Sequence, residues 1–138
     1  MAVEPKNYVL DSFAALAYLQ DEGGAETVEK LFARAKAETA VLWMSVVNFA
    51  EVLYIVEREK GWAETHRVIA MIDEWPIKVV EAGRAQAFAA AHLKARHAFS
   101  LGDAFAAGLA VMKKAAVVTG DPEFRALTPE IAIEWISR

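Results

Sequence analysis

The chain has 138 residues and no cysteine, and its 19 acidic and 15 basic side chains give a net charge of −4. A chain of this length fits one compact domain that buries about two thirds of its unfolded surface. The absence of cysteine excludes disulfides, thiolate zinc sites and a cysteine nucleophile. No uncharged apolar run approaches the roughly 18 residues of a membrane span, and residues 1–7 lack the apolar core of a signal peptide. We therefore expect one cytoplasmic domain over residues 1–138, with no membrane contact.

Short apolar runs alternate with amphipathic segments along the chain, and Ser or Asp stands directly before several of the latter as an N-cap. In chain order the pattern predicts strand 7–11, helix 12–19, helix 24–38, strand 40–45, helix 46–60, helix 62–75, strand 77–82, helix 84–97, helix 101–114, strand 115–121, turn 121–124 and strand 131–136. Strands that alternate with helices form a parallel sheet covered on both faces. We therefore expect an α/β fold with about five parallel strands.

Four carboxylates stand alone inside, or at the end of, apolar segments: Asp11, Glu51, Asp103 and Asp121. An isolated buried carboxylate costs several kcal/mol, roughly, unless it is paired, hydrogen-bonded or bound to a metal. Asp11 and Asp121 end predicted strands, and ligands of parallel sheets bind at the carboxyl ends of strands. If the helices that carry the other two acids pack over the same end, all four carboxylates meet in one pocket.

Charge repulsion indicates what such a pocket must also contain. Two like charges about 4 Å apart repel by about 4 kcal/mol at an effective dielectric constant near 20, so four carboxylates need cations or protons. Oxygen ligands without histidine or cysteine suit Mg²⁺ or Mn²⁺ rather than zinc. One or two such ions would lower the pKa of water and stabilise charge on phosphorus, which favours phosphodiester hydrolysis. Without these four acids the remaining 15 balance the 15 basic residues, so the net charge does not exclude nucleic acid.

Three of the four acids also have structural explanations. Asp11 fits a helix N-cap, Ser100 and Asp103 fit a capping box, and "TGDP" forms a turn that includes Asp121. Glu51 lies in mid-helix among apolar residues, where it caps nothing. Capping and metal binding therefore both remain open for the first three, whereas Glu51 favours the metal site.

Four sequence blocks resemble the PIN-domain ribonucleases, specifically the VapC-type toxins of bacterial and archaeal toxin–antitoxin pairs: "VLDSFAALAYL", "SVVNFAEVLY", "SLGDAFAAGLA" and "VVTGDPEF". The resemblance implies a single PIN domain with a Rossmann-like twisted parallel sheet and helices on both faces. It also implies Mg²⁺- or Mn²⁺-dependent endonucleolytic cleavage of RNA, a homodimer, and inhibition by a VapB-like antitoxin.

Residue by residue, the resemblance implies that Asp11, Glu51 and Asp103 are core metal ligands and that Asp121 is the fourth acid of the catalytic set. Ser12 and Thr119 match small hydroxyl positions beside the metal site. The chain departs from the family at Gly102, where alanine is more usual, and we expect no more than a slightly looser start to that helix.

Other polar and aromatic residues have weaker assignments. Asn48 lies one helical turn before Glu51, where it can orient that carboxylate or touch the substrate. Candidate phosphate contacts, with a solvated surface as the alternative, are Arg125, Lys113 and Lys114. The four tryptophans, Trp135 among them, are interpreted as core or interface residues rather than platforms for stacking bases.

Two other functions are compatible with an α/β fold of this size but fit the sequence less well. A catalytically silent PIN-fold interaction module would have no reason to bury four acids. An aspartate-based phosphatase of the haloacid type needs a second aspartate two residues after Asp11, where the chain has Phe13. Receiver-type phosphotransfer domains need paired acids near the first strand and a lysine after a late strand, and neither is present. The sequence therefore favours a metal-dependent endoribonuclease.

Overall fold

The computed structural model describes residues 4–137. In chain order its elements are β1 (Lys6–Leu10), α1 (Ser12–Leu19), α2 (Ala25–Lys36), β2 (Ala40–Ser45), α3 (Val46–Lys60), α4 (Trp62–Glu74), β3 (Lys78–Val80), α5 (Arg84–Arg96), α6 (Leu101–Lys113), β4 (Ala116–Thr119), the 3₁₀ helix η1 (Pro122–Leu127) and β5 (Ile133–Trp135). Within this described part, every helix is too short or too polar to cross a bilayer.

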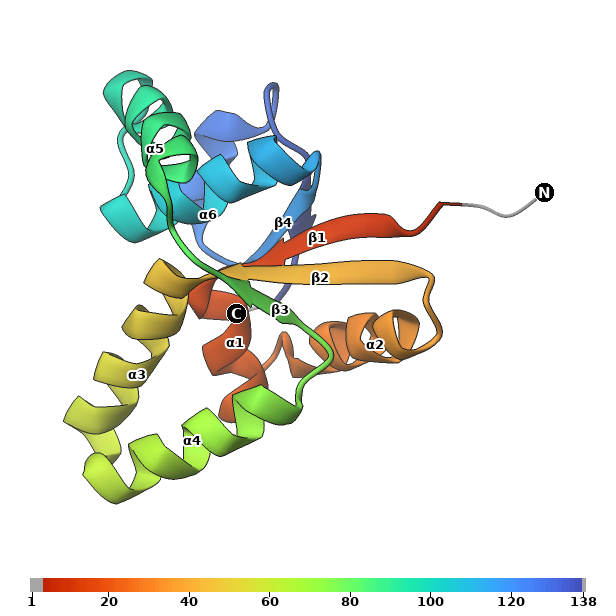
Figure 1. Ribbon diagram of the computed structural model, residues 1–138, viewed down its shortest axis with the longest axis vertical. Coiled ribbons are helices and arrows are strands. Elements are labelled where there is room, and N and C mark those ends of the chain that lie inside the picture. Colours follow the sequence, from red (N-terminus) through yellow and green to blue (C-terminus); the bar gives the residue numbers. More distant parts are fainter. Residues whose placement is uncertain (1–3, 138) are drawn as a thin grey trace.

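The five strands form one parallel sheet in the order β3-β2-β1-β4-β5 (Figure 1). The chain adds β2 and β3 on one side of β1 and then returns to add β4 and β5 on the other. The strand order therefore reverses between β1 and β4, and in such sheets ligands bind outside the carboxyl ends of the strands at this point. The predicted α/β fold with five parallel strands is confirmed.

Helices cover both faces of the sheet, and the alternation of side chains along each strand divides the core in two. Tyr8 and Leu10 of β1 pack with α1 to α4, whereas Val9 between them packs with α5, α6 and η1. β4 behaves in the same way, with Val118 on the first face and Val117 on the second. Figure 1 shows the two helical layers on opposite sides of the strands. Strands buried on both faces explain why their sequences are continuously apolar.

The region after β4 differs from the prediction. The strand expected over 115–121 ends at Thr119, and the expected turn extends into the 3₁₀ helix Pro122–Leu127. Asp121 caps this helix and Pro122 occupies its first turn, where a proline loses no helical hydrogen bond. The last strand is shorter than expected and comprises Ile133–Trp135.

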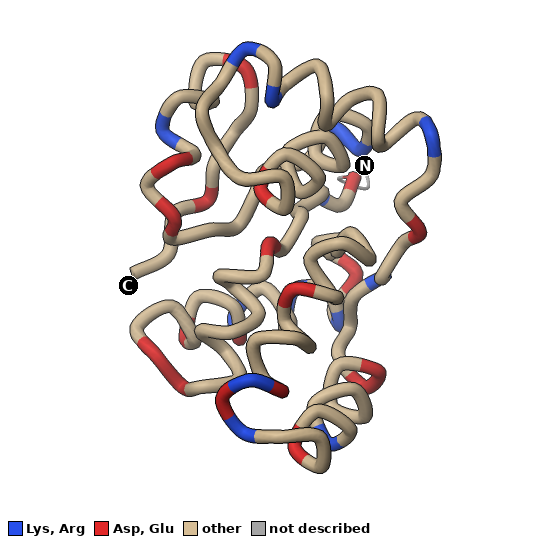
Figure 2. The backbone as a smooth tube through the Cα atoms, turned by 90° about the vertical axis from the view of Figure 1, so that its left-hand side faces the viewer, with Lys and Arg blue, Asp and Glu red and all other residues tan. Residues whose placement is uncertain are grey.

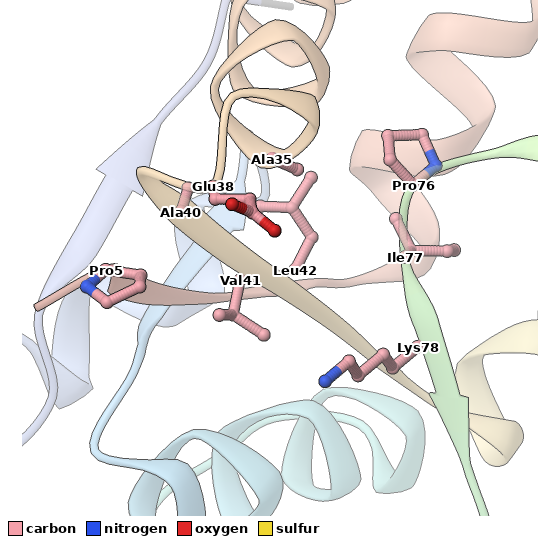
Figure 3. Close-up of a pocket in the computed structure, with 9 residues that line it drawn as sticks. All are labelled: Pro5, Ala35, Glu38, Ala40, Val41, Leu42, Pro76, Ile77 and Lys78. Carbon is pink, nitrogen blue, oxygen red and sulfur yellow. The ribbon is translucent and has the colours of Figure 1, made fainter.

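A groove of about 670 Å³ lies where β2 and β3 begin (Figure 3). It is lined by Pro5, Ala35, Glu38, Ala40, Val41, Leu42, Pro76, Ile77 and Lys78. Only two of these residues are charged, one of each sign. The groove therefore lies at the amino ends of the strands, away from the edge where the strand order directs ligands.

Candidate metal centre

Asp11 and Asp121 lie at the carboxyl ends of the two strands between which the order reverses. Asp11 directly follows β1 and is 1% exposed, and its Oδ1 accepts a hydrogen bond from the Ala14 amide at 2.9 Å. Asp121 comes two residues after β4, and its Oδ1 accepts one from the Glu123 amide at 2.9 Å. Each acid therefore caps the helix that follows its strand, and the adjacent parallel strands bring the two caps together at one edge.

Asp103 reaches the same edge from the first turn of α6. The Ser100 hydroxyl accepts a hydrogen bond from the Asp103 amide at 3.1 Å, which fixes the start of the helix. The Asp103 side chain is buried, at 7% exposed. The predicted cap at Ser100 is confirmed, and it holds a carboxylate in the positive field of the helix N-terminus.

Glu51 lies in the second turn of α3, and two neighbouring residues determine the position of its carboxylate. The Asn48 side-chain amide donates to Glu51 Oε1 at 2.8 Å and to the Gly102 carbonyl at 3.1 Å, so it ties α3 to the start of α6. A Cβ atom at Gly102 would overlap the Glu51 carboxylate. The expected orienting role of Asn48 agrees with this geometry. Gly102 has a larger consequence than a looser helix start, because its missing side chain makes room for Glu51.

Burial and mutual repulsion disfavour the ionised forms of these acids. The pKa of Asp11 rises from 3.8 to about 7, chiefly because burial removes water from the carboxylate. The charges of Asp121 and Glu51 raise this pKa further, whereas hydrogen bonds from Thr119 and the Ala14 amide lower it. Both other acids therefore lie close enough to act on Asp11 electrostatically.

The pKa of Asp103 rises from 3.8 to about 8, again mainly through burial. The charges of Asp121 and Asp11 raise it further, and so does a hydrogen bond with the Asp121 side chain. Four acids that are distant in the sequence thus interact at one edge. In Figure 1 β1 and β2 run from right to left, so Figure 2 looks onto their carboxyl ends, with acidic positions from several segments near its centre.

Sequence reasoning missed a fifth acid, Glu123. Ligand oxygens of Asp103, Asp121 and Glu123 all lie within 4.8 Å of one another. The available signal was the spacing Asp-Pro-Glu directly after a strand, because a tight helical turn folds the second acid back towards the first. Because residues 121–124 were interpreted only as a turn, Glu123 was not assigned to the site.

The donor set fits a hard divalent cation. It offers carboxylate oxygens only, and Mg²⁺ and Mn²⁺ prefer oxygen ligands. Among residues 4–137 none of the five acids forms an ion pair with a lysine, arginine or histidine. Part of the rise in the pKa values of Asp11 and Asp103 comes from the charges of neighbouring acids, which a bound cation would offset.

The remaining predicted site residues divide into two groups. Ser12 begins α1 beside Asp11, and the Thr119 hydroxyl accepts from the Asp121 amide at 3.0 Å, so both lie at the acidic edge. Arg125 belongs to η1, the 3₁₀ helix that Asp121 caps.

Lys113 and Lys114 are not brought to the acids. Lys113 lies ten residues beyond Asp103 in α6, a rise of roughly 15 Å, and its Nζ is 4.1 Å from the centroid of the Trp43 ring. Lys114 lines a separate groove beside the starts of β1 and β4. The expected phosphate contacts of these two lysines therefore have no support at the metal centre.

Comparison with models of protein families shows to which family this chain belongs. The family model for the PIN domain matches residues 8–128, a segment that contains all five acids. The chain belongs to the PIN-domain family. A comparison with curated proteins finds no match.

Solved structures of VapBC and VapC proteins have a similar fold. VapBC2 from Rickettsia felis, bound to a DNA fragment from its promoter, matches with a TM-score of 0.77 and 16% identity, over 95% of this chain and 99% of the other. DNA-bound VapBC from Salmonella typhimurium matches with a TM-score of 0.71 and 17% identity, over 94% and 97%. The sarcin–ricin-loop-cleaving toxin VapC20 from Mycobacterium tuberculosis matches with a TM-score of 0.68 and 18% identity, over 86% and 93%. At these identities the matches establish the PIN fold.

Proposed function

We propose that this PIN domain is a metal-dependent endoribonuclease that acts in the cytoplasm as the toxin of a VapBC-type toxin–antitoxin pair. The observation that carries the proposal is the group of carboxylates at the switch point of the sheet, two of which have a pKa raised to about 7 and about 8. A chain gains nothing for its own stability from burying like charges, so the arrangement favours a bound cation and a function that uses it.

The proposed metal ligands and catalytic residues are Asp11, Glu51, Asp103 and Asp121, and Glu123 adds a carboxylate at the exposed side of the cluster. The cofactor is Mg²⁺ or Mn²⁺, in one or two ions. When bound, such an ion lowers the pKa of a water molecule and offsets the negative charge that develops on the attacked phosphate. Phosphoryl oxygens of RNA complete the oxygen coordination that Mg²⁺ prefers.

The surrounding residues keep these oxygens in place. Asn48 holds one oxygen of Glu51, and the Ala14 amide holds one oxygen of Asp11, so each carboxylate presents a fixed orientation to the cation. Hydrogen bonds that orient metal ligands in this way strengthen binding in metalloenzymes, and their loss typically costs about 10- to 100-fold in affinity or activity. Thr119 acts on both strand-end acids, through its hydroxyl contact with Asp11 and the Asp121 amide.

The test is cleavage of total cellular RNA by the purified protein with Mg²⁺ or Mn²⁺ and with EDTA. We expect metal-dependent cuts at defined sites, which Asp11→Asn abolishes. The matched control is Asp21→Asn, the same chemical change at an exposed loop residue. Metal binding without cleavage by the wild type would contradict the nuclease and favour the catalytically silent interaction module.

The partner proposal follows from the fold neighbours, which include toxins solved together with their antitoxins in VapBC complexes. We expect a VapB-like antitoxin to bind this chain and block cleavage, and the toxin to form a homodimer. Induced expression should arrest growth with the wild type and the Asp21→Asn control and not with Asp11→Asn. A strictly monomeric protein in analytical ultracentrifugation would contradict the homodimer.

A further inference from the structure

A second groove, of about 870 Å³, lies beside the metal centre and is not needed to hold the cation. It is lined by Gly120, Pro122, Arg125, Thr128, Trp135 and Ile136, and we call it the η1–β5 groove. Its volume falls within the range of about 300–1,000 Å³ that is typical of sites for small molecules. The groove therefore has the size of a subsite for part of a substrate.

The groove lies at the carboxyl ends of β4 and β5, where Thr119 pairs with Trp135. Two of the residues that line it, Gly120 and Pro122, flank Asp121 in the chain, so the groove begins next to one residue of the acidic cluster. A Cβ at Gly120 would lie 3.1 Å from the Ile136 carbonyl oxygen and against the Phe13 ring, so glycine permits the close packing of this floor.

The chemistry of the lining fits a nucleotide. Arg125 is exposed and has no ion-pair partner among residues 4–137. Trp135 lies on the edge strand β5 and leaves 40% of its surface exposed, so it is not a core residue. A cation for the phosphate and an aromatic ring for the base are the two elements with which proteins bind single-stranded nucleic acids. The neighbouring Glu123 faces the metal centre, where a cation offsets its charge.

We propose that the η1–β5 groove binds the nucleotide adjoining the cleaved bond in single-stranded RNA, with Trp135 stacking on its base and Arg125 contacting its phosphate. This inference rests on the proposed nuclease function. A groove of this kind would select an unpaired segment of the substrate, because a base within a duplex is already stacked and does not offer its face to the indole ring of Trp135.

The experiment measures binding of a fluorescent single-stranded oligoribonucleotide, taken from a mapped cleavage site, to full-length protein carrying Asp11→Asn so that the RNA stays intact. Adding Trp135→Ala is expected to weaken binding about 5- to 150-fold, the range for loss of one stacked base, and Trp135→Phe much less. Adding Arg125→Gln is expected to make the slope of log affinity against log salt concentration shallower by about 0.7, the loss of one phosphate contact on a single strand.

Matched controls are Trp62→Ala and Arg58→Gln, which change an exposed tryptophan of α4 and an exposed arginine of α3. Both should bind the RNA as tightly as the parent, and the paired form of the same oligonucleotide should bind weakly to all variants. The Arg125→Gln salt slope remains informative if Trp135→Ala does not fold.

The outcomes separate the two proposals. If the wild type cleaves RNA but the groove variants bind it with unchanged affinity and salt dependence, the groove assignment is wrong and the nuclease stands. If RNA binding is unchanged while binding of the antitoxin is lost, the groove belongs to a protein partner and the inference is equally overturned. A wild type that neither binds nor cleaves RNA would refute the nuclease itself.

Discussion

Replacing Asp11 with asparagine should stabilise the metal-free protein at alkaline pH. The pKa of Asp11 rises from 3.8 to about 7 in the folded chain. At about 1.4 kcal/mol per unit, this rise of about three units corresponds to about 4 kcal/mol as an upper limit. Asparagine cannot ionise and is as good an N-cap as aspartate, so it keeps the hydrogen bond from the Ala14 amide. The substitution therefore removes a buried charge without removing the cap.

The sign of the pH dependence follows from proton binding. An unfolded Asp11 ionises near 3.8 and the folded one near 7, so the folded state binds more protons between these values. The stability that Asp11 contributes is complete below pH 4 and is lost as the pH rises through 7. Asp103, with a pKa of about 8, acts in the same direction and extends the loss to slightly higher pH.

Urea unfolding followed by circular dichroism, at pH 5 and pH 8.5 in EDTA, measures this effect. We expect Asp11→Asn to be more stable than the wild type at pH 8.5, by up to about 4 kcal/mol, and to lose less stability between the two pH values. Asp21→Asn should follow the wild type. Lower stability of Asp11→Asn at pH 8.5, with an unchanged pH slope, would refute the reasoning and leave capping as the only role of this acid.

Three further measurements test the metal centre. Saturating Mg²⁺ or Mn²⁺ should raise the melting temperature of the wild type and not of Asp11→Asn, since a ligand stabilises the state that binds it; equal shifts would contradict a site at this acid. Mn²⁺ affinity in calorimetry should increase from pH 6 to pH 8.5, because two carboxyls with pKa values of about 7 and about 8 must lose protons; a flat profile would argue against their ligation. Gly102→Ala should weaken Mn²⁺ binding by displacing the Glu51 carboxylate, although helix propensity alone predicts a stabilisation of about 1 kcal/mol; unchanged affinity would show that Glu51 does not need this space.

The order of elements was predictable because local chemistry marks each boundary. Ser45 and Ser100 precede helices and accept hydrogen bonds from the amides of Val47 and Asp103, as their position in the sequence indicates. Apolar runs without charges identified strands that are buried on both faces. The ends of β4 and β5 were less predictable, because an apolar run such as "AAVVTG" does not reveal where its neighbour stops pairing.

Positions that depend on packing between distant segments were not predictable. The contact of Lys113 with the Trp43 ring depends on how α6 crosses the sheet, whereas its distance of ten helical residues from Asp103 already follows from the predicted helix. The sequence left Trp135 in "IAIEWI" as either a core or an interface residue, and its exposure follows from the place of β5 at the edge of the sheet. Gly102 looks like a weak point of a helix until Glu51 of another helix is placed against it.

Capping and metal binding, which the sequence left as alternatives, are compatible in the structure. A carboxylate has two oxygens and about four sites for hydrogen bonds or metals. The caps formed by Asp11 and Asp121 each use Oδ1 alone, and Asp103 leaves the capping of its helix to Ser100. The helix caps thus fix the direction of the carboxylates while leaving oxygens for a cation. The same hydrogen bonds that begin these helices therefore orient Asp11 and Asp121 and anchor the segment that carries Asp103, whereas Glu51, in mid-helix, is oriented by Asn48.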